Sequence, residues 1–327
     1  MKNYKVLLLV TLTTIACLVG GVAQAFFLAE APKQAPPTTK GSAVNRAAAP
    51  PAAPPRAAPP AKASVPRGTY QAKGPPAVPK HFRGAYLDLV KMALTDLLYE
   101  NDPGAIEARK EGNDWPSRAI TMIGLKRLDN IQQCAEDVLL HRIPGDFIEA
   151  GVWRGGATIL MKAILQEYGD TTRSVWVADS FEGMPTPDPK KYPADKNMTL
   201  YQHEELAVSL EAVQKNFERF GVLDDRVKFL KGWFKDTLAK APIKRLAVLR
   251  LDGDMYESTM DTLVPLYPKL SPGGYCIVDD YYNLIEQRKA VDDYRREHGI
   301  TEEIKQIDWA SGYWQKRKRE GAKAGGP

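Results

Sequence analysis

Short apolar segments alternate with longer amphipathic segments through most of this 327-residue chain. The apolar segments have the length of strands: 146–150, 174–178, 227–230, 246–251 and 274–278. Apolar residues at helical spacing mark the segments between them: 157–168, 204–220, 259–267 and 286–297. This alternation predicts a parallel α/β sheet with helices on both faces. Segments 303–307 and 313–316 are predicted to form a closing hairpin, and two helical segments, 86–98 and 122–140, precede the first strand.

Acidic residues stand at the carboxyl ends of several predicted strands, among them Glu149, Asp179, Asp252 and Asp279. In parallel α/β sheets, ligands bind at this edge of the sheet. The acidic strand ends therefore predict a ligand site there.

A glycine-containing turn, with Gly151 and Gly155, follows Glu149 and leads into a predicted helix. Glycine permits positive φ and a close approach of a ligand to the backbone. The turn lacks the dinucleotide fingerprint G-x-G-x-x-G, and Glu149 would repel a pyrophosphate but suits a ligand with an ammonium group. An ordinary strand-to-helix turn is the alternative. Asp179, after the next strand, is well placed to accept hydrogen bonds from ribose hydroxyls, which favours a nucleoside-type cofactor.

Four aspartates follow two buried-looking strands: Asp252 and Asp254 after the fourth, and Asp279 and Asp280 after the fifth. If these strands are neighbours, their carboxylates converge and repel one another unless a cation or a proton joins them. Oxygen-only ligands favour Mg²⁺ or a similar hard cation. Helix N-capping is the alternative role for aspartate here, but four aspartates across two strand ends favour a metal.

Several motifs resemble the macrocin and mycinamicin O-methyltransferase family, which includes antibiotic sugar methyltransferases. They are EAGVWRGG at 149–156, ADSFEG at 178–183, GWFKDTL at 232–238, LRLDGDMYEST at 249–259 and VDDY at 278–281. The resemblance covers roughly residues 86–316, including TMIG at 121–124 and GYWQK at 312–316, and leaves out the first 80 residues. It implies a Rossmann-like class I methyltransferase sheet with N-terminal cap helices over the substrate.

The resemblance also implies a reaction and its residues. S-adenosylmethionine would donate the methyl group, Mg²⁺ would be the metal, and the acceptor would be a hydroxyl of a sugar, on a glycosylated small molecule or a glycan. The residues implied around the cofactor are Glu149, Gly151, Gly155, Asp179, Ser180 and Glu182; those implied as metal ligands are Asp252, Asp279 and Asp280. The metal would lower the pKa of the reacting hydroxyl, and Asp254 would take its proton as general base. Family members often form dimers or larger oligomers, so a homo-oligomer is implied.

Other interpretations stay open at this point. His203 is the other possible base, although a lone histidine near a helix start is more often a surface residue. Trp233, after the third strand, lies either near the adenine or in the core. A nucleotide-dependent oxidoreductase would need the G-x-G-x-x-G turn that this chain lacks. A surface-displayed binding module without turnover is the second alternative, which the intact acidic positions disfavour.

The N-terminal quarter differs in composition from the rest. Residues 1–30 carry Lys2 and Lys5 before an uncharged run from 6 to 29, which predicts a signal peptide or a membrane anchor. Residues 31–80 are rich in Pro and Ala, with eight basic and no acidic residues, and predict a disordered linker. The predicted methyltransferase domain then spans 81–320, and a flexible tail spans 321–327.

Charge and location follow from these segments. Of the net charge of +5, residues 1–30 contribute +1 and the linker +8, which leaves −4 for the folded part. A nucleic-acid partner is therefore not predicted, although the basic linker could favour an anionic surface. Because S-adenosylmethionine is an intracellular metabolite, we expect an uncleaved membrane anchor with a cytoplasmic catalytic domain; export is the alternative. None of the three cysteines has metal-ligand spacing or implies a disulfide framework.

Overall fold

The computed structural model describes residues 80–317, with side chains from Gly84 onward. The predicted leader (1–30), all but the last residue of the predicted linker (31–80) and the predicted tail (321–327) lie outside the described residues. Within residues 80–317, no helix is both long enough and apolar enough to cross a bilayer.

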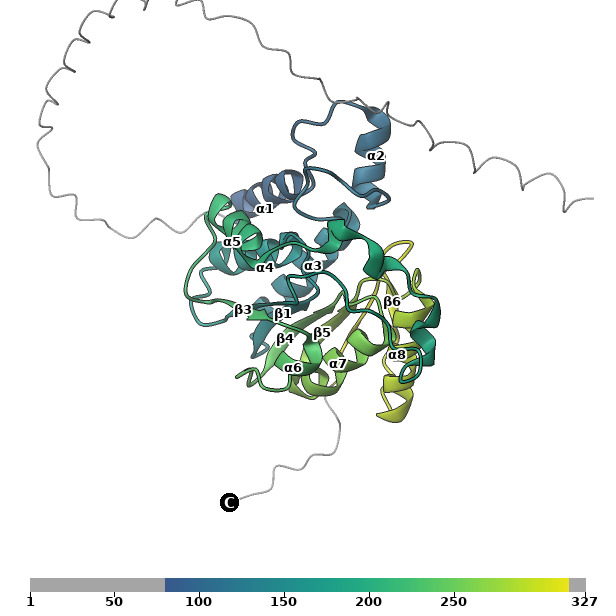
Figure 1. Ribbon diagram of the computed structural model, residues 1–327. Helices are drawn as coiled ribbons and strands as arrows, with labels where there is room; N and C mark the ends of the chain where they lie inside the picture. The colour runs from purple at the N-terminus through teal and green to yellow at the C-terminus, as the bar shows by residue number, and fades with distance from the viewer. Residues whose placement is uncertain (1–79, 318–327) are drawn as a thin grey trace, which may run out of the picture. The chain divides into compact units, whose positions relative to one another are not determined.

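A seven-stranded sheet forms the centre of the molecule (Figure 1), in the order β3-β2-β1-β4-β5-β7-β6. The strands are β1 Asp146–Ala150, β2 Val175–Asp179, β3 Val227–Lys231, β4 Leu246–Leu251, β5 Leu270–Val278, β6 Lys305–Gln306 and β7 Gly312–Gln315. The first five are parallel to one another, and β7 runs antiparallel between β5 and β6. The predicted Rossmann-like α/β architecture is confirmed, and so is the closing hairpin, with β7 rather than β6 next to β5.

Helices cover both faces of the sheet (Figure 1). Those on one side are α1 Lys80–Leu94, α3 Leu125–Leu140, α4 Gly156–Glu167 and α5 Leu210–Arg219; those on the other are α6 Phe234–Thr237, α7 Tyr256–Leu266 and α8 Ile285–Glu297. Neighbouring strand residues point into two separate cores, because side chains alternate across a strand. In β1, Phe147 packs in the core of α3 and α4, whereas Ile148 packs in the core of α7 and α8.

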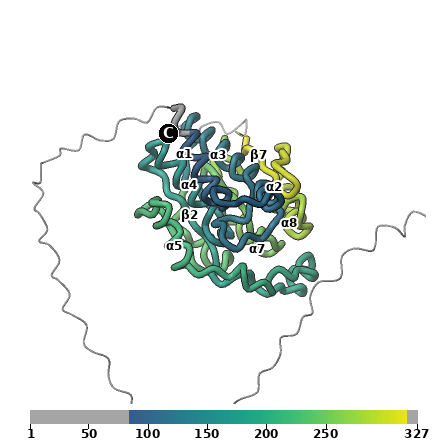
Figure 2. The backbone as a smooth tube through the Cα atoms, turned by 90° about the horizontal axis from the view of Figure 1, so that it is seen from above, coloured from purple at the N-terminus to yellow at the C-terminus, as the bar shows by residue number. Residues whose placement is uncertain are grey.

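The N-terminal cap contains a helix that the hydrophobic periodicity does not predict, α2 Pro103–Glu111. Asp102 caps it by accepting a hydrogen bond from the Ala105 N–H at 2.7 Å, and Pro103 occupies its first turn. In the view from above (Figure 2), α1 and α2 lie on the viewer's side of the molecule together with α3 and α4. The two predicted cap helices are confirmed as α1 and α3, so α2 and its flanking loops are the additional part of the cap.

The helix predicted over 204–220 starts later than expected. Ser209 caps α5 through a hydrogen bond from the Ala212 N–H to its Oγ at 3.2 Å, so α5 begins at Leu210. The preceding chain forms short 3₁₀ turns, η1 Pro193–Asn197, η2 Leu200–Gln202 and η3 Glu204–Leu206. A further short turn, η4 Tyr267–Lys269, follows α7.

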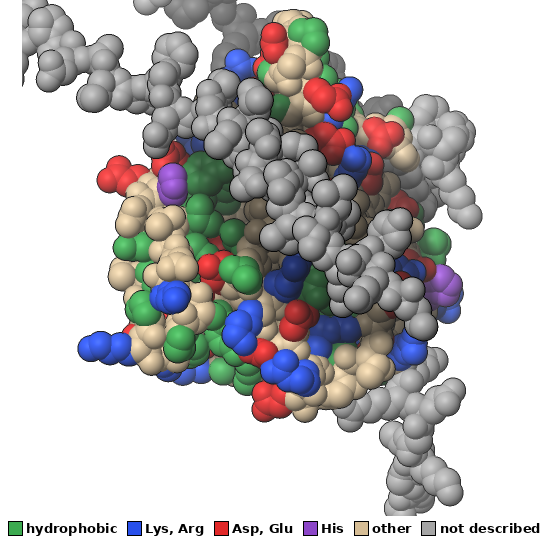
Figure 3. All heavy atoms as spheres, turned by 90° about the vertical axis from the view of Figure 1, so that its right-hand side faces the viewer, with side chains coloured by type: hydrophobic (Ala, Val, Ile, Leu, Met, Phe, Trp, Pro, Cys, Tyr) green, Lys and Arg blue, Asp and Glu red, His purple; other side chains and the backbone are tan. Residues whose placement is uncertain are grey.

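Charged side chains of both signs are interspersed on the face shown in Figure 3. The sequence of the folded part likewise contains both signs of charge, with a net charge of −4.

The central strand β4 carries a charge in its interior. All six of its residues are buried, and the fifth is Arg250. A buried guanidinium is costly unless carboxylates and hydrogen-bond acceptors surround it. Arg250 is therefore expected to pair with the acidic residues at the neighbouring strand ends.

Candidate functional site

Arg250 joins the carboxyl ends of three adjacent strands. It is 1% exposed and lies opposite Glu149 of β1 in the sheet register. Its guanidinium donates hydrogen bonds to Glu149 of β1, to Asp279 at the end of β5, and at 2.8 Å to Asp252 at the end of β4. Arginine suits this position because its planar fork can serve several carboxylates at once and stays charged when buried.

A second buried arginine, Arg127 of α3, connects the cap side of the molecule to the same carboxylates. It is 5% exposed and donates to Asp279 Oδ2 and to Asp308 Oδ2, both at 2.7 Å. Both oxygens of Asp279 are thus held by arginines. Burial alone would raise the pKa of Asp279, but the guanidinium groups of Arg127 and Arg250 outweigh it and lower the pKa.

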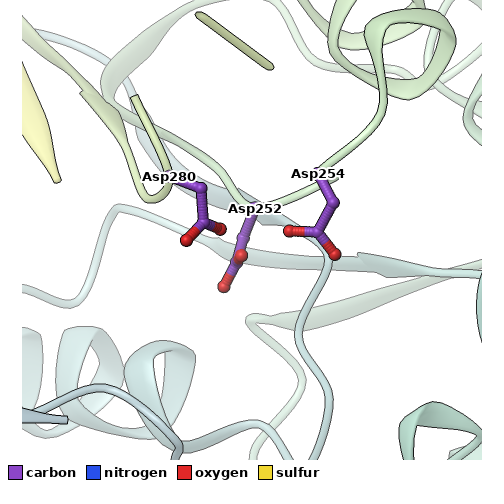
Figure 4. Close-up of side chains that lie close together, drawn as sticks. All are labelled: Asp252, Asp254 and Asp280. Atoms are coloured by element: carbon purple, nitrogen blue, oxygen red, sulfur yellow. The ribbon is translucent and has the colours of Figure 1, made fainter. Parts of the chain in front are cut away.

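Three other aspartates converge beside this network (Figure 4). Carboxylate oxygens of Asp252, Asp254 and Asp280 lie within 4.8 Å of one another. Burial and the negative charge of Asp279 raise the pKa of Asp252 and Asp280 well above the ordinary value. Burial, followed by the charge of Asp252, raises the pKa of Asp254 to about 7. Three such groups cannot all be ionised together without a cation, so the cluster is suited to bind one.

The converging aspartates differ from the predicted ligand set. Asp252 and Asp280 belong to both sets, but the third member in the structure is Asp254, which the sequence analysis assigns as the base. Asp279, a predicted ligand, instead binds Arg127 and Arg250. The physical reason is that consecutive residues at a strand end point to opposite sides, so Asp279 and Asp280 face different partners.

A first cavity lies at the carboxyl ends of β1, β2 and β4. Its lining comprises Met122, Gly151, Trp153, Asp179, Ser180, Gly183, Met184, Pro185, Leu206, Trp233, Phe234, Lys235, Asp252, Gly253, Asp254, Glu257, Ser258 and Asp261. Three of the predicted cofactor residues, Gly151, Asp179 and Ser180, therefore line this cavity. Gly155 and Glu182 do not line this cavity. Trp233 does line it, so Trp233 does not lie in the hydrophobic core.

A second cavity adjoins the first beneath the cap. Its lining comprises Gly112, Asn113, Asp114, Trp115, Thr121, Met122, Ile123, Arg127, Glu149, Val152, Trp153, Ala157, Leu200, Leu206, Arg250, Asp252, Asp254, Asp279, Asp280, Asn283, Leu284 and Trp309. The two cavities share Asp252 and Asp254, together with Met122, Trp153 and Leu206. Two ligands bound in the two cavities would therefore meet at the aspartates.

The turn after β1 is held by Asp179 and by two glycines. The Asp179 carboxylate accepts hydrogen bonds from the backbone N–H groups of Val152 and Phe181, both at 2.8 Å. Gly151 has a φ of +89°, and a Cβ there would lie 1.8 Å from the Asp252 carbonyl oxygen. Gly155 has a φ of +87°, and a Cβ would lie 2.9 Å from Val213 of α5. The positive φ values predicted for these glycines are confirmed, and other parts of the chain approach both of them closely.

Glu149 lies between the arginine network and the second cavity. It is 2% exposed, and burial raises its pKa to about 7 despite the opposing charge of Arg250. One carboxylate oxygen accepts from Arg250, and no described side chain donates a hydrogen bond to the other, Oε2. A buried acceptor of this kind can receive a cationic donor from a ligand.

Several residues of the site escape prediction from sequence. Arg127 and Arg250 are charged residues within apolar, periodic segments, and that conflict was an available signal. Trp153, in contrast, has a left-handed φ of 48° and lines both cavities, which no local pattern indicates. His203, the alternative base, is exposed and lines neither cavity; its ring contacts Trp115 edge-on, with centroids 4.9 Å apart.

Comparison with known proteins decides the family. The family described as Macrocin-O-methyltransferase (TylF) matches residues 78–316. The chain belongs to this macrocin O-methyltransferase family. It is thus an S-adenosylmethionine-dependent O-methyltransferase, which confirms the predicted family and enzyme class.

Individual relatives of this methyltransferase share about half of its aligned residues. An 8-demethyl-8-(2,3-dimethoxy-alpha-L-rhamnosyl)-tetracenomycin-C 4'-O-methyltransferase of Streptomyces olivaceus is 54% identical over 243 residues, which cover 71% of this chain and 93% of the relative. The mycinamicin III 3''-O-methyltransferase of Micromonospora griseorubida is 49% identical over 244 residues, covering 71% and 96%. Among solved structures, the O-methyltransferase NovP matches with a TM-score of 0.70 and 51% identity, over 72% of this chain and all of NovP.

Loss of Arg250 should be among the most destabilising single changes in the methyltransferase. Arg250→Met leaves Glu149 and Asp252 without their buried cation and Asp279 with Arg127 alone, so we expect the free energy of unfolding to fall by roughly 3–5 kcal/mol. Arg118→Met removes an exposed ion pair with Asp96 and should cost far less, because solvent screens the pair. Urea unfolding followed by circular dichroism measures both, and equal losses would contradict the role assigned to Arg250.

The metal-free protein should be more stable in acid than at neutral pH. Glu149 and Asp254 have folded-state pKa values of about 7, above their unfolded values, so the folded state binds more protons between pH 4 and pH 7. Stability is then greatest below the unfolded pKa and is lost as pH rises through about 7. We expect the Tm of the protein in EDTA to fall by about 5 °C or more between pH 5 and pH 8. Asp254→Asn should reduce this fall, and an unchanged fall would count against the raised pKa of Asp254.

Proposed function

We propose that the protein transfers the methyl group of S-adenosylmethionine to a hydroxyl of a sugar in a glycosylated acceptor, with Mg²⁺ at the aspartate cluster. The observation that carries the proposal is the junction of the two cavities at Asp252 and Asp254. The relatives support the sugar acceptor, since the name of the Streptomyces olivaceus enzyme describes 4'-O-methylation of a compound that carries a dimethoxy-rhamnosyl group.

The first cavity fits the nucleoside part of the cofactor, which supplies the electrophilic methyl group. Asp179 keeps acceptor capacity for ribose hydroxyls beside its two backbone hydrogen bonds. Trp233 offers an indole for the adenine. The Oε2 of Glu149, which lines the second cavity, suits the cofactor's ammonium group, so the cofactor would extend across the junction of the two cavities. The acidic lining, with Lys235 as its one cation among the described residues, favours a positively charged sulfonium compound over a phosphate.

The aspartate cluster fits a hard divalent cation. Asp252 and Asp280 would hold it, and Asp279 stays behind them on Arg127 and Arg250. When bound, Mg²⁺ supplies stabilisation of negative charge on the acceptor oxygen. The raised pKa values of Asp252 and Asp280 support this assignment, because a cation removes the repulsion that raises them.

Asp254 is the residue proposed to take the proton of the acceptor hydroxyl. It lines both cavities, so its carboxylate can reach a hydroxyl held between the cofactor and the aspartate cluster. Its left-handed φ of 57° turns the chain back after Gly253 and brings the carboxylate to Asp252 and Asp280. Asp254 can thus accept a proton beside the cluster that holds the charge.

The acceptor is proposed to be uncharged. Among the described residues of the second cavity, the cations are Arg127 and Arg250, and both are engaged by buried carboxylates. Five aspartates and Glu149 line the same cavity. A diphosphate would find no partner and much repulsion there, so the sugar is methylated after its transfer from any nucleotide carrier.

A first test separates chemistry from cofactor binding. Asp252→Ala and Asp254→Asn should each lower methyl transfer by at least about 100-fold, while S-adenosylhomocysteine still binds within a factor of a few. The assay is transfer from radiolabelled S-adenosylmethionine to extract components, with product identification and with EDTA added. Asp129→Asn, an exposed aspartate of α3, is the matched control. Full activity of Asp252→Ala would refute the proposal, and cofactor binding without any transfer by wild type would favour the binding module.

A second test addresses the charge of the acceptor. In NMR titrations of the protein with S-adenosylhomocysteine and Mg²⁺, thymidine diphosphate should cause no shifts in residues of the second cavity. Neutral rhamnosides should shift them, because they bring no charge to the acidic lining. Diphosphate binding in the millimolar range or tighter would show that a nucleotide-linked sugar is accepted.

For location we propose that residues 1–30 anchor the protein in the membrane with the catalytic domain in the cytoplasm, where the methyl donor is made. The apolar run in the sequence supports the anchor. Fractionation with protease protection distinguishes this arrangement from export. The homo-oligomer implied by the family resemblance stays a prediction, which light scattering after size-exclusion chromatography checks.

A further inference from the structure

We propose that Trp115 and Trp309 form an outer subsite of the second cavity, which binds an uncharged apolar ring face of the acceptor beyond the methylated sugar. The inference rests on the proposed function and names the residues that select the acceptor. Both side chains line the second cavity, although they come from opposite ends of the folded chain. Trp115 lies between α2 and α3, and Trp309 lies between β6 and β7.

Both indoles are exposed. Trp115 is 51% exposed and Trp309 is 44% exposed, whereas Trp176 and Trp314 are buried. An indole that lines a cavity and keeps about half of its surface in water gains free energy when a ligand covers it. The two residues therefore offer apolar area to a ligand that extends outward from the aspartates.

The orientation of Trp309 is set by its surroundings. Its Nε1 donates to the Glu111 carbonyl oxygen at 3.0 Å, and Arg127 lies 5.3 Å from its ring centroid. The hydrogen bond joins the C-terminal hairpin to the end of α2 and uses the polar group of the indole. What remains for a ligand is the aromatic surface that Arg127 does not cover, so Trp309 suits an apolar contact rather than a hydrogen bond.

The loop that carries Trp115 is also held in place. The neighbouring Asp114 pairs with Arg109 of α2 at 3.1 Å, and Arg109 is 4% exposed. Arg109 further donates to the Thr121 carbonyl oxygen at 3.2 Å, which ties α2 to the chain before α3. Together with the edge-on contact of His203, these interactions fix the position of the Trp115 ring.

Trp153 is not part of this subsite. It lines both cavities, its Nε1 donates to the Glu205 carbonyl oxygen at 2.8 Å, and Arg154 lies 4.0 Å from its ring centroid. Trp115 and Trp309 line the second cavity but not the first, which places them away from the cofactor side.

The ligand chemistry follows from these surroundings. Tryptophan faces bind the C–H face of a pyranose or a flat aromatic ring through burial of apolar area. The acidic residues of the cavity, Asp114 and Asp280 among them, disfavour an anionic group. A second sugar ring and an aromatic aglycone share this chemistry, and both would extend a glycoside beyond the ring that is methylated.

The experiment compares three neutral probes: methyl α-L-rhamnoside, 4-nitrophenyl α-L-rhamnoside and a rhamnosyl disaccharide. Dissociation constants are measured by NMR titration of the full chain with S-adenosylhomocysteine and Mg²⁺ present. We expect wild type to bind at least one extended glycoside about tenfold more tightly than the methyl glycoside. Trp115→Ala and Trp309→Ala should each remove most of this difference and leave the Kd of the methyl glycoside within twofold.

Controls and outcomes separate the proposals. Tyr99→Ala removes an aromatic residue that is 76% exposed outside both cavities, and it should change no Kd. If the tryptophan substitutions weaken binding of the nitrophenyl probe only, the subsite binds an aromatic aglycone. If they weaken binding of the disaccharide only, it binds a second sugar. Equal weakening of all three probes, or none, overturns the outer subsite while the proposed function stands. If wild type binds no glycoside, both fall.

Discussion

The site depends on one buried guanidinium in the middle of the sheet. Arg250 lies in the central strand β4, where burial forces it to find carboxylates, and it finds them at the ends of β1, β4 and β5. Arg127 adds a second cation from α3 and shares Asp279 with Arg250. The carboxylates at this edge of the sheet therefore pair with buried arginines as well as facing the cavities. The cap is attached to the edge through the ion pair of Arg127 with Asp279.

This network divides the acidic residues into two groups. Glu149 and Asp279 face the arginines, Asp254 and Asp280 converge at the boundary of the two cavities, and Asp252 belongs to both groups because it also pairs with Arg250. The converging aspartates retain the repulsion that a cation relieves. Residues from the cap, the 3₁₀ turns and the C-terminal hairpin then complete the second cavity, which explains why its lining comes from so many parts of the chain.

Strand and helix positions could be predicted because they depend on local periodicity. β1 is found where expected and β2 within one residue, but α5 begins six residues later than predicted because Ser209 caps it. α2 was missed because its apolar residues are few and its cap, Asp102, gives a weak signal. The glycines were located correctly, but the atoms that approach Gly151 and Gly155 belong to Asp252 and Val213, far away in sequence.

The amino-acid sequence by itself determined the alternation of strands and helices and the acidic strand ends, because both depend on residues within a few positions of one another. The tertiary structure alone decided which aspartate faces a guanidinium and which faces a cavity. Arg127 lies 152 residues from Asp279, and Trp309 lies 198 residues from Glu111. Only folding brings these groups together, and the cost of burying an unpaired charge then selects their partners.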